Sequence, residues 1–129
     1  MHILIIEYNH KDAKQLAEQI LQHIPAAESI EITDDLGRIP NWGIWAKGKK
    51  MIFIDLAIAL QVELGNIEEI KNCKVIFTLS EYYFYLTRWI ESASENYLVK
   101  PVRLKALKKV METTETQHVH SFHSFEVKS

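Results

Sequence analysis

The chain has 129 residues, of which 47% are hydrophobic and 25% are charged, and this composition excludes an intrinsically disordered protein. The formal net charge of -2 excludes a strongly basic surface, so we expect no nucleic-acid partner. The lone cysteine, Cys73, cannot form an internal disulfide, and the opening apolar run is too short for a signal peptide or a membrane span. We therefore expect a cytoplasmic protein without a membrane partner.

Residues 3–6 form a short apolar run rich in β-branched side chains, which predicts a strand buried on both faces. Apolar residues at helical spacing then predict a helix that Pro25 ends. Residues 29–33 alternate apolar and polar side chains and predict a more exposed strand. Residues 34–50 contain three glycines and a proline, which predict a loop with a short irregular helix, while Trp42 and Trp45 both call for burial.

The alternation continues through the second half of the chain. Apolar runs predict strands at residues 51–54, 74–79 and 96–99. Helical spacing predicts helices at about residues 61–71, 82–93 and 102–114. Strands that alternate with helices predict an α/β fold, in which helices cover both faces of a parallel sheet. We expect one domain over residues 1–116, followed by a flexible tail or the start of a linker over residues 117–129.

Parallel sheets of this kind place their chemistry at the carboxyl ends of the strands. At these ends the sequence has Glu7, Asp55, Lys100 and the hydroxyls of Thr78 and Ser80. A carboxylate can act as a nucleophile toward phosphorus, and a divalent cation between two acids can offset the charge of a phosphoryl group. A hydroxyl and an ammonium group can hydrogen-bond the new phosphoryl oxygens. The set predicts a pocket in which a carboxylate accepts a phosphoryl group.

The chain resembles the receiver domain of two-component response regulators over about residues 1–115. The segment Asn96-Tyr97-Leu98-Val99-Lys100-Pro101 looks like the aromatic, hydrophobic, hydrophobic, Lys-Pro signature of that family. Residues 3–7 and 51–55 match its first and third strands, and residues 76–83 are most similar to receivers that precede LytTR-type DNA-binding domains. The resemblance implies a flavodoxin-like sheet with strand order 2-1-3-4-5 and a signalling domain that is not an enzyme.

The resemblance also implies a role for each matched residue. Asp55 would accept a phosphoryl group from a histidine kinase or a phosphotransfer protein. Glu7, Asp55 and the backbone carbonyl of Ala57 would hold Mg²⁺. Lys100 would contact the phosphoryl group.

The same resemblance implies a switch that reports phosphorylation. Tyr97 would be its aromatic residue. Its hydroxyl is Ser80 if no gap is placed before Lys100, and Thr78 if the spacing of other receivers is used.

Two departures from the family pattern leave a second function open. Tyr8 stands where the family has its second acid, and an uncharged phenol cannot replace an anionic ligand of Mg²⁺. The residues after Asp55 lack the proline and glycine of the family's loop, and Asp55 by itself could serve as a helix N-cap. The alternative is a phosphorylation-independent pseudo-receiver that acts as a protein-interaction or dimerisation module.

An enzyme of similar topology fits the residues less well. Residues 55–57 lack the second acid of haloacid-dehalogenase-like phosphatases, and no Ser/Thr/Gly-rich loop follows the first strand as it does in flavodoxins. The predicted helix over residues 82–93 is rich in aromatic side chains, which are typical of protein interfaces. We therefore expect a homodimer that forms through the region from Tyr82 to Ala93.

Overall fold

Five parallel strands form the centre of the molecule, in the order β2-β1-β3-β4-β5. The strands are β1 (His2–Ile6), β2 (Ser29–Thr33), β3 (Lys50–Asp55), β4 (Lys74–Leu79) and β5 (Tyr97–Val99). The computed structural model describes residues 1–62, 64, 67–80 and 97–112. This strand order is the flavodoxin-like arrangement, and it confirms the predicted fold class.

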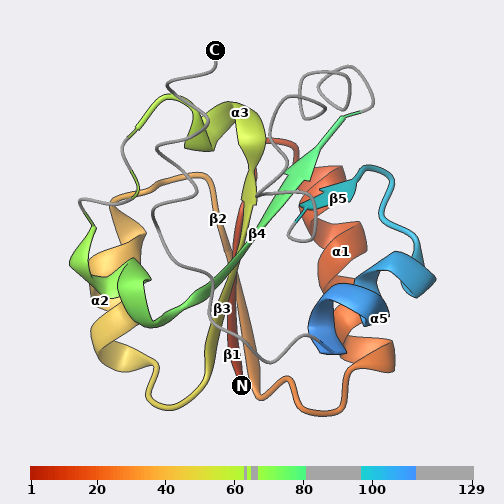
Figure 1. Cartoon of the computed structure of the whole chain (residues 1–129), viewed down its shortest axis with the longest axis horizontal. Coiled ribbons are helices and arrows are strands. Elements are labelled where there is room, and N and C mark those ends of the chain that lie inside the picture. The colour runs from red at the N-terminus through yellow and green to blue at the C-terminus, as the bar shows by residue number, and fades with distance from the viewer. Residues whose placement is uncertain (63, 65–66, 81–96, 113–129) are drawn as a thin grey trace.

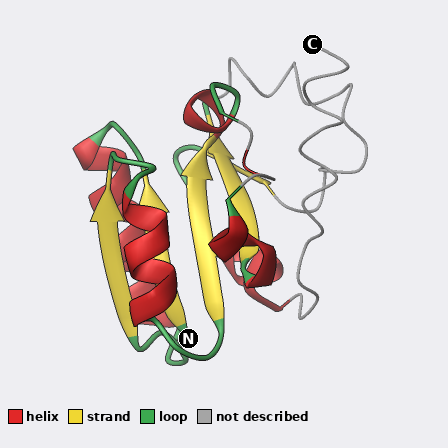
Figure 2. Cartoon of the chain, turned by 90° about the vertical axis from the view of Figure 1, so that its left-hand side faces the viewer, coloured by secondary structure: helices red, strands yellow, loops and turns green. Residues whose placement is uncertain are grey.

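Helices cover both faces of the sheet, as the sequence predicts (Figures 1 and 2). They are α1 (His10–His23), α2 (Arg38–Trp45), α3 (Leu56–Ala59), the 3-10 helix η2 (Glu68–Asn72) and α5 (Leu104–Glu112). One core cluster joins α1 and α5 to the sheet, and the other lies between the sheet and α2, α3 and η2. In the described part of the chain, none of these helices has both the length and the apolar character needed to span a bilayer.

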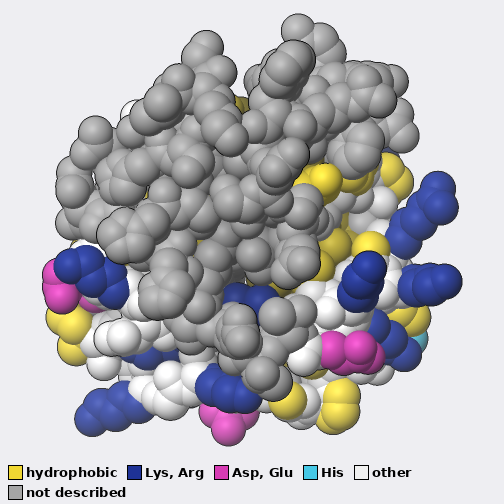
Figure 3. Space-filling view, in the orientation of Figure 1, with side chains coloured by type: hydrophobic (Ala, Val, Ile, Leu, Met, Phe, Trp, Pro, Cys, Tyr) yellow, Lys and Arg dark blue, Asp and Glu magenta, His cyan; other side chains and the backbone are white. Residues whose placement is uncertain are grey.

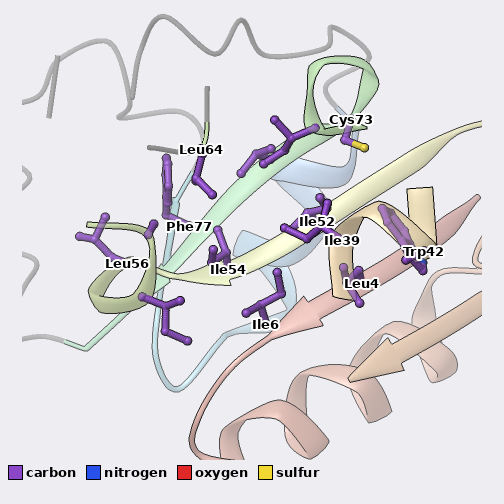
Figure 4. Close-up of a cluster of buried hydrophobic side chains, with 14 of the residues drawn as sticks. Leu4, Ile6, Ile39, Trp42, Ile52, Ile54, Leu56, Leu64, Cys73 and Phe77 are labelled. Atoms are coloured by element: carbon purple, nitrogen blue, oxygen red, sulfur yellow. The ribbon is translucent and has the colours of Figure 1, made fainter. Parts of the chain in front are cut away.

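Burial of the inner strands explains why their sequences are continuously apolar. β1 lies between β2 and β3, so that Ile5 pairs with Ile32 on one side and Phe53 on the other. Side chains alternate between the two faces of a strand, so Ile5 faces α1 whereas Ile6 belongs to the cluster under α2 (Figure 4). β2 is an edge strand with a half-exposed pattern, which accounts for its alternating sequence.

Residues 38–45 form a regular helix, α2, where the sequence predicted a loop with a short irregular helix. Pro40 lies in the first turn of α2, where its missing N–H group costs no helical hydrogen bond. Trp42 is fully buried against the sheet, in agreement with its predicted burial (Figure 4). Trp45 is 61% exposed, with its ring in a T-shaped arrangement with the His2 ring, so the prediction that it is buried is wrong. Helical geometry permits one inward face, and Trp42 occupies it.

The close approach of α2 to η2 depends on Gly43. A Cβ atom on Gly43 would lie 2.7 Å from Glu69 Cβ, well inside van der Waals contact. We expect Gly43→Ala to lower the free energy of unfolding by about 1–3 kcal/mol, because the two helices must move apart. Asn41→Ala, at an exposed position of the same helix, is the matched control and should change stability by less than about 0.5 kcal/mol. Equal urea midpoints for the two variants would contradict this packing.

The predicted helix over residues 61–71 is wrong in its position. A four-residue helix, α3, begins directly after Asp55, because the Asp55 side chain caps it, and η2 forms later as a separate 3-10 helix. The apolar residues after Asp55 therefore pack as a helical turn, with Leu56 and Ile58 buried. The predicted helix over residues 82–93 and the predicted tail over residues 117–129 lie outside the described residues.

Charged side chains are spread over the visible surface. Figure 3 shows Lys and Arg side chains along the edges of one face, several of them together at its right-hand side, and a few acidic side chains at the same edges.

Candidate functional site

Three charged residues predicted from the strand ends meet at the carboxyl edge of the sheet. Glu7 follows β1, Asp55 ends β3, and Lys100 follows β5. Lys100 Nζ donates to Glu7 Oε1 at 2.6 Å and to Asp55 Oδ2 at 2.7 Å. β4 lies between β3 and β5, so Lys100 reaches Asp55 at the end of β3 only because its side chain is long enough to extend past β4. The peptide bond between Lys100 and Pro101 is cis.

Asp55 has two partners, one for each carboxylate oxygen. While Oδ2 accepts from Lys100, Oδ1 accepts from the backbone N–H of Ala57 at 2.8 Å and so caps α3. The side chain is 13% exposed. The N-cap role and the pocket role, which the sequence set against each other, are therefore combined in one residue.

Glu7 is held by the loop between β1 and α1. Its Oε2 accepts from the backbone N–H of Asn9 at 3.3 Å, and Asn9 in turn caps α1 by accepting from the N–H of Asp12 at 3.1 Å. The Glu7 side chain is 6% exposed. These two local hydrogen bonds hold the loop in the conformation in which Glu7 Oε1 reaches Lys100.

Asp12 is a residue of the site that the sequence analysis missed. Its Oδ2 lies 3.6 Å from Lys100 Nζ, so a third carboxylate faces the same ammonium group. The signal was present: Asp12 is three residues after the N-cap Asn9, in the first turn of α1, at the strand-end edge of the sheet. An acid in the first turn of a helix is usually explained by its favourable interaction with the helix dipole, so the sequence offers no separate reason to place Asp12 beside Lys100.

The charges of the pocket favour the protonated form of Lys100. Burial by itself would lower the pKa of Lys100, but hydrogen bonds to Asp55 and Glu7 and the charges of both carboxylates raise it above the ordinary value of 10.5. Three carboxylates thus surround one ammonium group that stays charged throughout the neutral range.

This raised pKa predicts how the stability depends on pH. A group whose pKa is higher in the folded state binds its proton more tightly there, so its contribution is complete below 10.5 and is lost as the pH rises through the raised value. We expect the stability difference between wild type and Lys100→Met, measured by urea unfolding, to stay constant to about pH 9 and then to shrink. The comparison cancels the opposite contribution of Lys74, whose pKa is lowered by burial and by Lys49. A difference that grew with pH would contradict the prediction.

The predicted hydroxyl and aromatic residues lie nearby but differ in position. Thr78 is buried in β4 and pairs in register with Asp55, whereas Ser80 lies beyond the end of that strand and is half-buried. Tyr97 is half-buried and packs against the cluster on the α2 side of the sheet. Of the two candidate hydroxyls, Thr78 is therefore the one placed beside Asp55.

The predicted Mg²⁺ ligands do not fit a metal ion in this arrangement. Lys100 bridges Glu7 and Asp55, and the carbonyl oxygen of Ala57 accepts from Gln61 Nε2 at 2.9 Å. Tyr8, in place of an acid, is 56% exposed. Among the described residues, no group of three or more His, Cys, Asp or Glu side chains is arranged to hold a metal ion.

Comparison with known proteins gives no family for this chain. No protein-family model, no curated protein and no solved structure matches it. Its function has to be inferred from the fold and from the cluster of Glu7, Asp55 and Lys100, and the resemblance to receiver domains stays a prediction.

Proposed function

We propose that the chain is a receiver-like signalling domain that works as a phosphorylation-independent interaction module, that is, a pseudo-receiver. The observation that carries this proposal is the position of Lys100 Nζ, within 2.7 Å of carboxylate oxygens on both Glu7 and Asp55. The flavodoxin-like sheet supports the receiver-like architecture. The cluster supports the absence of phosphorylation, because Lys100 already bonds the carboxylates of Glu7 and Asp55.

Phosphorylation of Asp55 needs a carboxylate oxygen that can turn toward the phosphorus, and enough positive charge to receive a phosphoryl group. Both oxygens of Asp55 have hydrogen-bond partners, one on Ala57 and one on Lys100. An incoming phosphoryl group would also meet the carboxylates of Glu7 and Asp12, with one ammonium group to offset them. Repulsion of this kind is strong in a partly buried site, so it opposes the transfer.

Two observations favour a second candidate function, in which Asp55 is a phosphoacceptor. Lys100 already contacts the carboxylate that would carry the phosphoryl group, and Thr78 is next to Asp55 in the register of the sheet. In that reaction Asp55 Oδ2 would attack the phosphorus of a phosphohistidine. The P–N bond would break, and the imidazole would leave with its electron pair and take up a proton.

Acetyl phosphate separates the two candidates. We expect wild-type protein, incubated with this donor and millimolar Mg²⁺, to show no gain of a phosphoryl group in its intact mass. Asp55→Asn is the control for modification at any other residue. A mass gain in wild type that disappears in Asp55→Asn would overturn the pseudo-receiver proposal and establish the phosphoacceptor.

The interaction half of the proposal has its own test. The predicted dimer surface, residues 82–93, lies outside the described residues, so its test is a measurement of mass in solution. We expect sedimentation equilibrium to give a dimer for wild type with or without beryllofluoride, and a monomer for Phe84→Ala. A monomeric wild type, or a dimer that forms only with beryllofluoride, would contradict an interaction module that acts without phosphorylation.

A further inference from the structure

We infer that Lys100 takes the place that a divalent cation would occupy, so that the native domain neither needs nor binds one at this pocket. The inference deepens the proposed function and rests on it, because a pocket that excludes Mg²⁺ is one reason for Asp55 to stay unphosphorylated. It is carried by the mismatch between the predicted Mg²⁺ ligands and the contacts those groups make.

The first step is the geometry around the ammonium group. Lys100 Nζ lies 2.6 Å from Glu7 Oε1, 2.7 Å from Asp55 Oδ2 and 3.6 Å from Asp12 Oδ2. These carboxylates come from the end of β1, the end of β3 and the first turn of α1. A lysine ammonium has three N–H donors, so one group can face all three acids. Lys100 therefore joins three separate elements to the segment after β5.

The second step is burial. The side chains of Glu7, Asp55 and Lys100 are all at most 15% exposed. Buried carboxylates need a compensating charge, because water no longer screens them. Lys100 supplies one such charge together with a short hydrogen bond to each of the two buried carboxylates, so it meets part of the need that a Mg²⁺ ion would otherwise meet.

The third step is competition. Lys100 is attached to the chain, so its ammonium group is present at a high effective concentration beside the acids. A divalent ion would have to displace it and break two short charge-assisted hydrogen bonds. The ion would also find the carbonyl of Ala57 already bonded to Gln61 and no acid at Tyr8. Mg²⁺ needs oxygen ligands in a regular octahedron and gives up its water reluctantly, so it competes poorly for such a pocket.

Removing the ammonium group tests the inference directly. In Lys100→Met the three carboxylates lose their counter-ion, and a divalent cation becomes the available replacement. We expect millimolar Ca²⁺ or Mg²⁺ to raise the melting temperature of Lys100→Met by several degrees and to leave wild type unchanged, at matched ionic strength. Lys105→Met removes an exposed lysine from α5 and should behave like wild type.

A double variant isolates the third acid. Asp12→Asn combined with Lys100→Met should lose most of the divalent effect that Lys100→Met gains. A wild type that is stabilised by these ions as much as Lys100→Met would overturn the inference, and so would a Lys100→Met protein that ignores them. No phosphoryl donor is present, so these outcomes are independent of the acetyl phosphate result.

A second measurement uses wild-type protein alone, in case Lys100→Met does not fold. Mn²⁺ broadens the amide resonances of residues close to where it binds. We expect no selective broadening at Glu7, Asp55 or Ala57 when wild type is titrated with Mn²⁺ to millimolar concentration. Selective broadening there would show a divalent ion at the pocket and overturn the inference. The proposed function would not fall with that result, because the acetyl phosphate experiment tests it separately.

Discussion

Lys100→Met should lower the free energy of unfolding by about 3 kcal/mol in the absence of divalent ions. The ammonium group is the shared partner of Glu7 and Asp55, whose side chains are 6% and 13% exposed. Without it two largely buried carboxylates face each other and Asp12 with no opposing charge. Loss of one partner from such a cluster is costly because the remaining charges stay desolvated, and methionine keeps the length and apolar part of the side chain.

Urea unfolding followed by tryptophan fluorescence measures this effect. Lys105→Met is the matched control, because it removes the same group from an exposed position, and it should change stability by less than about 0.5 kcal/mol. Asp55→Asn in the Lys100→Met background should recover part of the loss, because it removes one of the unpaired charges. Equal stability of Lys100→Met and Lys105→Met would mean that the acids are adequately solvated without Lys100.

Trp42→Ala should cost about 3–5 kcal/mol, the other large effect that we expect. Trp42 is fully buried in the cluster between α2 and the sheet, where it contacts the face formed by residues such as Leu4 and Ile52 (Figure 4). Truncation to alanine leaves a cavity that short, tightly packed helices cannot close. The measurement is the midpoint of thermal or urea unfolding, in which circular dichroism follows the loss of secondary structure.

Two further variants show whether the cost comes from lost volume. The Trp42 indole N–H is buried with no hydrogen-bond partner among the described residues, so Trp42→Phe loses no such bond and should cost less than half as much as Trp42→Ala. Trp45→Ala removes an equal side chain from an exposed position three residues later, and its effect should be below about 1 kcal/mol. Similar losses for Trp45→Ala and Trp42→Ala would contradict the packing of α2.

The strands and their chemistry were predictable because both depend on local sequence. Continuous β-branched runs mark strands that are buried on both faces, and residues directly after such runs must lie at the carboxyl edge of a parallel sheet. Glu7, Asp55 and Lys100 were found in this way, and the structure brings them together. To predict that these three residues lie close together, only the strand order was needed in addition, and the resemblance to receivers implied it.

The helices were less predictable because their positions depend on tertiary contacts. α2 is regular because Trp42 packs on the sheet and Gly43 lets η2 approach, and neither contact is visible in the sequence. α3 begins at Leu56 because the Asp55 side chain caps it. Apolar spacing alone could not separate Trp42 from Trp45, since only the packing decides which face of a helix is turned inward.

By itself, then, the sequence of this protein determined that a parallel α/β sheet forms and that Glu7, Asp55 and Lys100 lie along one edge of it. Only the tertiary structure decided which hydrogen bonds and ion pairs those groups make. It placed Asp12 beside Lys100 and gave each oxygen of Asp55 a partner. The physical reason is the sequence distance over which each property is set. Whether a strand is buried shows in the pattern of neighbouring residues, whereas the balance of charge in a pocket depends on distances of a few ångströms between residues that are far apart in the chain.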